Sequence, residues 1–154
     1  MNNEQKYQKT IECALRIQSA FLKGDDEIKE MFPKSFVYYK PKDIVSGDFY
    51  KSYQDATGKY LTVADCTGHG VAGAFISIVG MMTLDEIMSL KVKKLSSILK
   101  MLQAKIYNCL NQAENKDQNG MDITIMHYDN ANTITLTGAK HILYQVSVIV
   151  LALS

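Results

Sequence analysis

The sequence is poor in the residues that mark several common classes of protein. In 154 residues it has no tryptophan, two prolines and three cysteines, Cys13, Cys66 and Cys109. An odd number of cysteines without a Cys-x-x-Cys pair argues against a disulfide framework or a zinc knuckle. It favours a reducing compartment, so we expect a cytoplasmic protein. Cys13 and Cys109 fall near apolar positions of predicted helices, and we expect both to be buried.

The net charge is close to zero, and arginine is nearly absent. The chain carries 17 Lys and Arg against 16 Asp and Glu, a formal net charge of +1, and Arg16 is its single arginine. This balance excludes the basic surface of a general nucleic-acid binder. One arginine cannot form a guanidinium cluster for phosphate. We therefore expect no nucleic-acid partner.

Long hydrophobic runs are missing as well. Residues 1–10 are polar and lack the apolar segment of a signal peptide. The most apolar stretch, residues 142–153, is shorter than the roughly 20 residues that span a bilayer. We expect no membrane span, and we interpret residues 142–153 as a buried strand.

What remains is a chain with 47% apolar residues, enough for the core of one domain. Hydrophobic periodicity and helix-ending signals predict helices over residues 4–22, 25–31, 72–90 and 95–112. Strand patterns cover residues 35–39, 44–53, 59–64, 121–128, 133–137 and the segment from 141 onward. We expect 44–53 to form a hairpin with 59–64, and 121–128 with 133–137. This order of elements predicts an α+β fold in one domain.

Two aspartates, Asp48 and Asp65, lie within or at the end of the first predicted hairpin. Their carboxylates can meet at one sheet edge, and hard divalent cations prefer such oxygen ligands. A glycine-rich loop then leads into the helix over 72–90, whose N-terminus favours a bound phosphate. Metal and phosphate together are typical of metal-assisted phosphoester hydrolysis. The alternative is that each aspartate only caps a helix or forms a turn.

The strings YKPKDIVSGDFY (residues 39–50), ADCTGHGVAGAFIS (64–77) and GMD (120–122) carry a family resemblance. In order and spacing they resemble the SpoIIE/RsbU-type bacterial serine/threonine phosphatases, the bacterial branch of the PP2C-like (PPM) superfamily. The resemblance runs from about residue 13 to residue 144. It implies an α+β sandwich of two antiparallel sheets flanked by helices, here incomplete at the C-terminal end.

The resemblance also implies a set of site residues. Asp65 matches the aspartate that bridges two Mn²⁺ or Mg²⁺ ions, and Asp48 matches an acidic residue that reaches metal directly or through water. Cys66 matches a residue whose backbone carbonyl is a ligand. The remaining candidates are a substrate- or phosphate-binding loop and one residue at the site edge: Gly68, His69, Gly70 and Asp122.

The histidines have weaker signals. His69 lies four residues after Asp65, which is not the spacing of the superfamily's general acid, so a structural role at the helix N-terminus is the alternative for it. His127 and His141 are isolated on strand patterns, and we interpret them as structural or exposed.

The activity implied is hydrolysis of phosphoserine or phosphothreonine on a protein by a metal-bound water. The typical substrate is an anti-sigma-factor antagonist in stress, sigma-factor or two-component signalling. We divide the chain into a helical segment (1–32), a partial phosphatase domain (33–144) and a divergent apolar tail (145–154). The helical face with Ile11, Leu15, Gln18 and Leu22 packs on the core or links a homodimer.

The family's final metal-binding aspartate has no counterpart here. Asp129, in a predicted hairpin loop, is the one acidic residue among residues 123–154. We therefore expect a truncated chain with much weaker phosphatase activity than an intact relative. The alternative is a catalytically inactive remnant that binds a phosphoprotein or a dimer partner.

Overall fold

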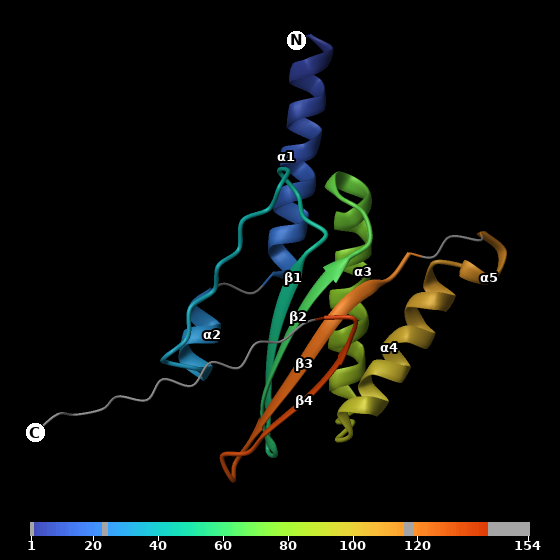
Figure 1. The fold of residues 1–154 in the computed structure, drawn as a ribbon. Helices are drawn as coiled ribbons and strands as arrows, with labels where there is room; N and C mark the ends of the chain where they lie inside the picture. The colour runs from blue at the N-terminus through green and yellow to red at the C-terminus, as the bar shows by residue number, and fades with distance from the viewer. Residues whose placement is uncertain (1, 23–24, 116–118, 142–154) are drawn as a thin grey trace, which may run out of the picture.

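The computed structural model describes residues 2–22, 25–115 and 119–141 (Figure 1). Its helices are α1 (Asn3–Phe21), α2 (Asp25–Met31), α3 (Gly70–Ser89), α4 (Leu95–Cys109) and α5 (Gln112–Asn115). Its strands are β1 (Phe49–Asp55), β2 (Gly58–Cys66), β3 (Met121–Asp129) and β4 (Ile134–Ala139). The α+β fold, all four predicted helices and both predicted hairpins are confirmed, with shifts of a few residues at their ends.

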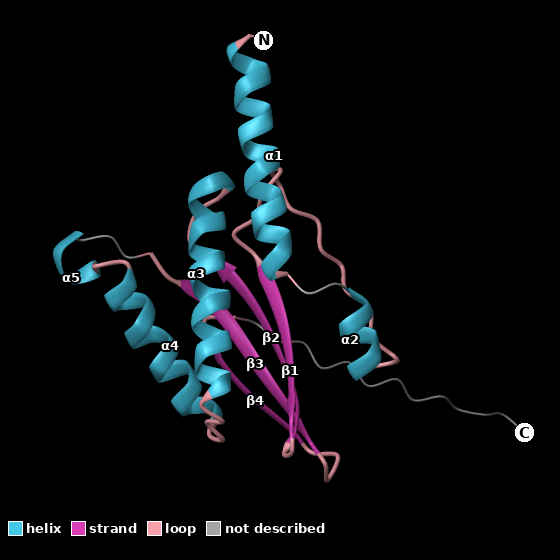
Figure 2. Ribbon diagram, turned by 180° about the vertical axis from the view of Figure 1, so that it is seen from behind, coloured by secondary structure: helices cyan, strands magenta, loops and turns pink. Residues whose placement is uncertain are grey.

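The four strands form one antiparallel sheet in the order β1-β2-β3-β4. Side chains along β2 alternate between its two faces, with Tyr60, Thr62 and Ala64 buried and Val63 and Asp65 exposed. α3 and α4 cover the buried face, as Figure 2 shows from behind. The opposite face carries Asp65 and is not covered by these helices.

The core lies between the sheet and the pair α3 and α4. Buried residues of α4 recur at three- and four-residue spacing, as an amphipathic helix requires, and meet the buried side of α3. Each fully buried aliphatic side chain contributes about 1.5–3 kcal/mol of hydrophobic stabilisation. The most buried members of the core are Phe49, Tyr60, Ala64, Met81, Leu84, Ile87, Ile98 and Ile125.

α3 is long and apolar enough to cross a membrane by length and composition, but half of that window is buried inside the fold. Its position against the sheet accounts for its apolar composition, as in the core helix of a soluble protein.

α1 begins with a capping box, in which the side chain of Asn2 accepts from the backbone of Gln5 and Gln5 bonds back. Its N-terminal half extends beyond the sheet (Figure 1). Gln18 is the buried residue of this helix, whereas Leu15 is 38% exposed. The predicted core face therefore packs only at its C-terminal end.

Two sequence expectations are wrong. No strand among the described residues includes residues 35–39, where Phe36 and Tyr38 are 85% and 80% exposed. Their aromatic character indicated a strand, but none of the strands that the structure describes pairs with them. Cys13 and Cys109 are exposed rather than buried, because both lie on helix faces turned away from the core.

Of the two sheets predicted for the sandwich, the described residues form one, with the helices that pack on it. This agrees with a PP2C-like fold that is incomplete. The strand predicted over residues 142–153, and with it the apolar tail 145–154, falls outside the described part of the chain. The division of the chain into segments 1–32, 33–144 and 145–154 stays a prediction.

Candidate functional site

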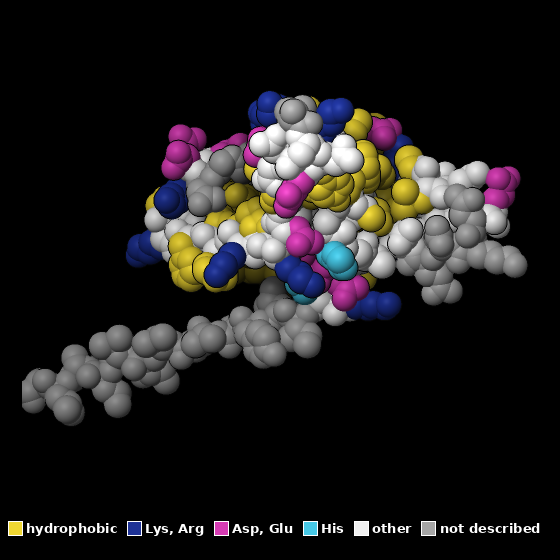
Figure 3. All heavy atoms as spheres, turned by 90° about the horizontal axis from the view of Figure 1, so that it is seen from above, with side chains coloured by type: hydrophobic (Ala, Val, Ile, Leu, Met, Phe, Trp, Pro, Cys, Tyr) yellow, Lys and Arg dark blue, Asp and Glu magenta, His cyan; other side chains and the backbone are white. Residues whose placement is uncertain are grey.

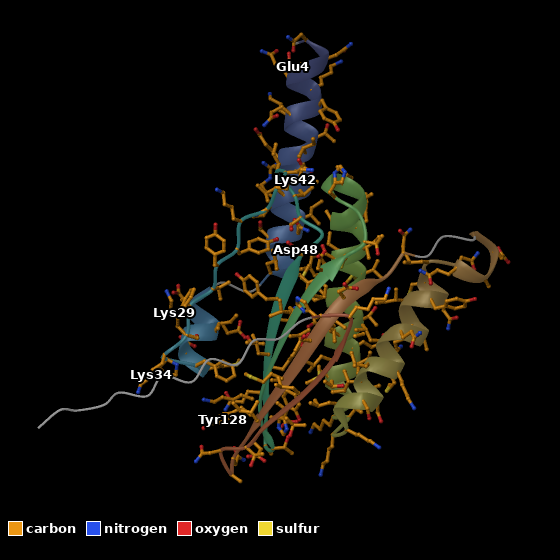
Figure 4. All side chains as sticks on the ribbon, viewed as in Figure 1. Glu4, Lys29, Lys34, Lys42, Asp48 and Tyr128 are labelled. Carbon is orange, nitrogen blue, oxygen red and sulfur yellow. The ribbon has the colours of Figure 1, made fainter. Side chains whose placement is uncertain are left out.

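Three aspartates lie in a row across one end of the sheet. Phe49 pairs with Ala64, so Asp48, directly before β1, lies opposite Asp65 of β2. Asp65 in turn pairs with Asp122 of β3. Residues paired across antiparallel strands point to the same face, with Cβ atoms about 4.5–5.5 Å apart. Figure 4 shows Asp48 at the upper end of β1, far from Tyr128 near the other end of the sheet.

Asp48 and Asp65 interact directly. Partial burial raises the pKa of Asp48, and the charge of Asp65 and a hydrogen bond with it raise the pKa further. His141 acts in the opposite direction and lowers it. The charge of Asp65 disfavours ionisation of Asp48, and a divalent cation that neutralises both carboxylates removes this cost. Their donor chemistry thus fits Mn²⁺ or Mg²⁺.

The backbone carbonyl of Cys66 lies beside Gly47, the residue before Asp48. A Cβ atom on Gly47 would sit 3.0 Å from the Cys66 oxygen and 2.9 Å from the Gly68 oxygen. These carbonyls therefore approach the residue that precedes Asp48. Burial, together with the charges of Asp65 and Asp48, raises the pKa of the Cys66 thiol to about 12. The thiol stays neutral, so the carbonyl is the donor that Cys66 can offer to a cation.

The glycine-rich loop depends on backbone that only glycine adopts readily. Gly68 has φ of +97° and Gly70 has φ of +60°. A Cβ atom on Gly73 would lie 2.5 Å from the Gly68 oxygen, so α3 packs against the loop through bare backbone. The loop can follow this path because three glycines, at positions 47, 68 and 73, meet there.

His69 is placed differently from the two carboxylates. It is the N-cap residue of α3 but makes no side-chain cap bond. Its Nδ1 lies 3.4 Å from an Asp43 carboxylate oxygen, and both line a separate cavity beside α1. The structure thus brings Asp48 and Asp65 together, and it does not bring His69 to them.

Asp122 occupies the third position of the row. It lines a neighbouring cavity of about 430 Å³ between α4 and the sheet, together with Thr67 and Lys140. This cavity lies on the α4 side of the sheet, so it does not test the placement of Asp122 at the site edge, which stays a prediction.

A hydrogen-bond network that the sequence did not reveal fixes the backbone of Asp48. The buried Gln18 side chain donates to the Ser46 carbonyl at 2.6 Å and accepts from the Ser46 N–H at 3.0 Å. The Ser46 hydroxyl accepts from the Asp48 N–H at 3.0 Å. The Tyr39 hydroxyl donates to the Asp48 carbonyl at 3.1 Å. The only signal in the sequence was a glutamine on an otherwise apolar helix face.

Asp48 and Asp65 open into a cleft of about 500 Å³ on the face of the sheet opposite α3 and α4. One wall is the segment 35–40, with its aromatic side chains, and another is formed by β1 and β2. His141 also lines the cleft, although the sequence gave no reason to place it there. Figure 3 shows acidic, lysine and histidine side chains gathered at this end of the molecule.

The fold and this site were compared with known proteins. No protein-family model and no curated protein matches the chain. Among solved structures, the SiaA-PP2C domain of Pseudomonas aeruginosa aligns with a TM-score of 0.78 and 27% identity over 89% of this chain. The PP2C phosphatase domain of SpoIIE from Bacillus subtilis aligns over 63% of the chain with a TM-score of 0.40 and 16% identity. The chain spans 55% of the SiaA domain structure.

Proposed function

We propose that the chain contains part of the active site of a metal-dependent protein serine/threonine phosphatase of the SpoIIE type, because its fold aligns with the SiaA-PP2C domain. The observation that carries this proposal is the meeting of Asp48 and Asp65 at one end of the sheet, with the Cys66 carbonyl next to Gly47. The similarity to a PP2C domain supports a phosphatase family, and the donor set supports metal dependence.

In this proposal Asp65, Asp48 and the Cys66 carbonyl hold Mn²⁺ or Mg²⁺. When bound, the cation supplies Lewis-acid stabilisation of the charge that builds up on the phosphate during hydrolysis. The protein's own part is to hold the donors in place. Ser46 and Tyr39 fix the backbone of Asp48, so that the main chain that carries its side chain needs little rearrangement on binding.

The proposed substrate is a phosphorylated protein, of the anti-sigma-factor antagonist type, in a cytoplasmic signalling system. The open cleft with aromatic residues of segment 35–40 on one wall supports this choice, since it has room for a phosphorylated side chain and its neighbours. A homodimer through α1 belongs to the same proposal. Its support is the exposure of Tyr7, Leu15 and Ile17 at 66%, 38% and 53%.

A second function is favoured by one observation. Within the described residues no group of three or more His, Cys, Asp or Glu side chains could hold a metal ion. Two carboxylates and a carbonyl bind a cation more weakly than a full ligand set. The second candidate is therefore a module that binds a phosphoprotein or a dimer partner without hydrolysing phosphate.

The test is Mn²⁺-dependent hydrolysis of a phosphoserine peptide by the purified chain, run beside a Mn²⁺ titration. Asp65→Ala removes a proposed ligand, and Asp26→Ala, an exposed aspartate on α2, is the matched control. Slow hydrolysis that Asp65→Ala abolishes and Asp26→Ala retains supports the phosphatase. Mn²⁺ binding by a folded chain without hydrolysis supports the binding module. Hydrolysis unaffected by Asp65→Ala contradicts the proposal.

A further inference from the structure

We propose that the cleft binds its substrate as an extended segment that pairs with residues 36–40 and carries apolar residues two and four positions from its phosphoserine. The inference rests on the proposed function and names how that site selects a phosphorylated protein. Its observations are the path of residues 32–39 over the sheet, the spacing of side chains on the floor of the cleft and the charge of its wall.

Residues 32–39 are held above β2 at both ends. At one end the Lys59 amine of β2 donates to the Met31 carbonyl at 2.6 Å and lies 5.8 Å from the centre of the Phe32 ring. At the other end the Tyr39 hydroxyl donates to the Asp48 carbonyl at 3.1 Å. The segment therefore runs from the level of Lys59 to the level of the aspartates.

This path requires an extended backbone. Lys59 and Asp65 are about 20 Å apart along β2, and residues 32–39 reach about 23 Å when fully extended. Exposed and half-buried side chains alternate over residues 35–40, as they do in a strand. No backbone–backbone hydrogen bond joins residues 36–40 to the rest of the described chain. Their N–H and C=O groups can therefore pair with an added strand.

The floor of the cleft repeats at the spacing of an extended chain. Asp65, Val63 and Leu61 point to the same face of β2, at steps of two residues or about 6.6 Å. An extended substrate has the same repeat. With its phosphoserine at Asp65, its side chains two and four positions away lie over Val63 and Leu61. Because Val63 is 42% exposed, an apolar side chain placed over it removes apolar surface from water.

The wall of the cleft favours an anionic partner. Residues 31–42 contain three lysines and no aspartate or glutamate, and Lys40 lines the cleft. Figure 4 shows the other two, Lys34 and Lys42, at the two ends of the segment. Lysine attracts phosphate as a point charge. A second copy of this chain would bring two such walls together, and this repulsion disfavours it as the occupant.

The first experiment needs no metal. Binding of fluorescent serine peptides, the products of the reaction, to the full chain is measured in EDTA. We expect leucine at the second and fourth positions from the serine to bind about 10-fold more tightly than aspartate there. Aspartate at the first and third positions should change binding little, because those side chains point away from the floor. No binding, or equal binding of all peptides, overturns the inference.

A variant of the floor gives the matching test on the protein. Val63→Asp should weaken binding of the leucine peptide by about 10-fold or more. Met82→Asp, at an exposed apolar residue of α3 on the other side of the sheet, should bind as wild type does. Both variants are checked for folding. Unchanged affinity in Val63→Asp overturns the inference, and so does self-association of the wild type that Val63→Asp abolishes, because the occupant is then a second copy.

Methylation of the peptide backbone tests the pairing with residues 36–40. The N–H groups of an added strand alternate in direction, so N-methylation should weaken binding at every second position. Equal tolerance at all positions overturns the inference. Finally, kcat/KM is measured with Mn²⁺ and the phosphoserine forms of the same peptides. Selective binding without hydrolysis refutes the phosphatase and leaves the inference standing, whereas hydrolysis that ignores the second and fourth positions refutes the inference and leaves the phosphatase standing.

Discussion

Replacing Gln18 with alanine should destabilise the fold and loosen the segment that carries Asp48. Gln18 is 1% exposed and bonds to both backbone groups of Ser46 and to the Ser77 hydroxyl. In Gln18→Ala the buried Ser46 N–H loses its partner, which costs about 1–3 kcal/mol. The Ser46 carbonyl keeps the Ser77 hydroxyl at 3.2 Å, so its loss is partial.

A small cavity adds to the cost, and the higher helix propensity of alanine returns a few tenths of a kcal/mol. We expect a net destabilisation of about 2–3 kcal/mol, measured as a lower urea midpoint at unchanged m. Gln8→Ala is the matched control on the same helix, because the Gln8 side chain is exposed and makes one 3.4 Å bond to Glu12. Its effect should stay within about 0.5 kcal/mol.

A third variant separates hydrogen bonding from packing. Gln18→Leu fills much of the same volume but cannot bond to Ser46, so it should remain destabilised by more than about 1 kcal/mol. The reasoning is refuted if Gln18→Ala behaves as Gln8→Ala does. Full stability in Gln18→Leu would show that volume, and not the network to Ser46, is what this position requires.

Three further predictions concern the same end of the sheet. Gly73→Ala should lower the free energy of unfolding by about 1–3 kcal/mol, measured by thermal unfolding, because its Cβ meets the Gly68 oxygen. Gly120→Ala is the control: no atom lies within 4 Å of its Cβ, so its free energy of unfolding should stay near that of wild type in the same assay. Asp48→Asn should raise the melting temperature of the metal-free chain at pH 7 and leave it unchanged at pH 3. The reason is that the pKa of Asp48 is raised in the folded state, so its ionisation above that pKa costs stability, which asparagine avoids. An equal rise in melting temperature at both pH values would contradict this reasoning. At pH 8 a thiol reagent should label the two exposed cysteines quickly and Cys66 only on unfolding, because the Cys66 thiol is buried and its pKa is about 12. Fast labelling of all three cysteines in the folded chain would contradict the burial of Cys66.

The elements that carry strong periodicity were predictable from the sequence. α4 has its apolar residues at helical spacing, and the hairpin of β1 and β2 turns at Asp55 and Gly58 as its pattern indicates. Residues 35–39 misled for a physical reason. Aromatic residues favour strands only where a neighbouring strand offers backbone partners, and a sequence does not show which neighbours will be there.

The register of the strands explains which residues of the site could be predicted from the sequence and which could not. Asp48 and Asp65 were predictable because a hairpin fixes which residues face each other. Gln18 and His141 were not, because they reach the site from α1 and from the backbone turn after β4. Contacts between residues so far apart along the chain depend on tertiary packing, which periodicity does not report.

The most direct test of the metal centre is an isothermal titration of Mn²⁺ into the chain and into Asp65→Ala, with both proteins shown to be folded. The account predicts that wild type binds Mn²⁺ and is stabilised by it, by about 2.7 kcal/mol at a free concentration 100 times the Kd. It predicts that Asp65→Ala loses both the binding and the stabilisation. Equal Mn²⁺ binding by the two proteins would contradict the assignment of Asp65 as a ligand.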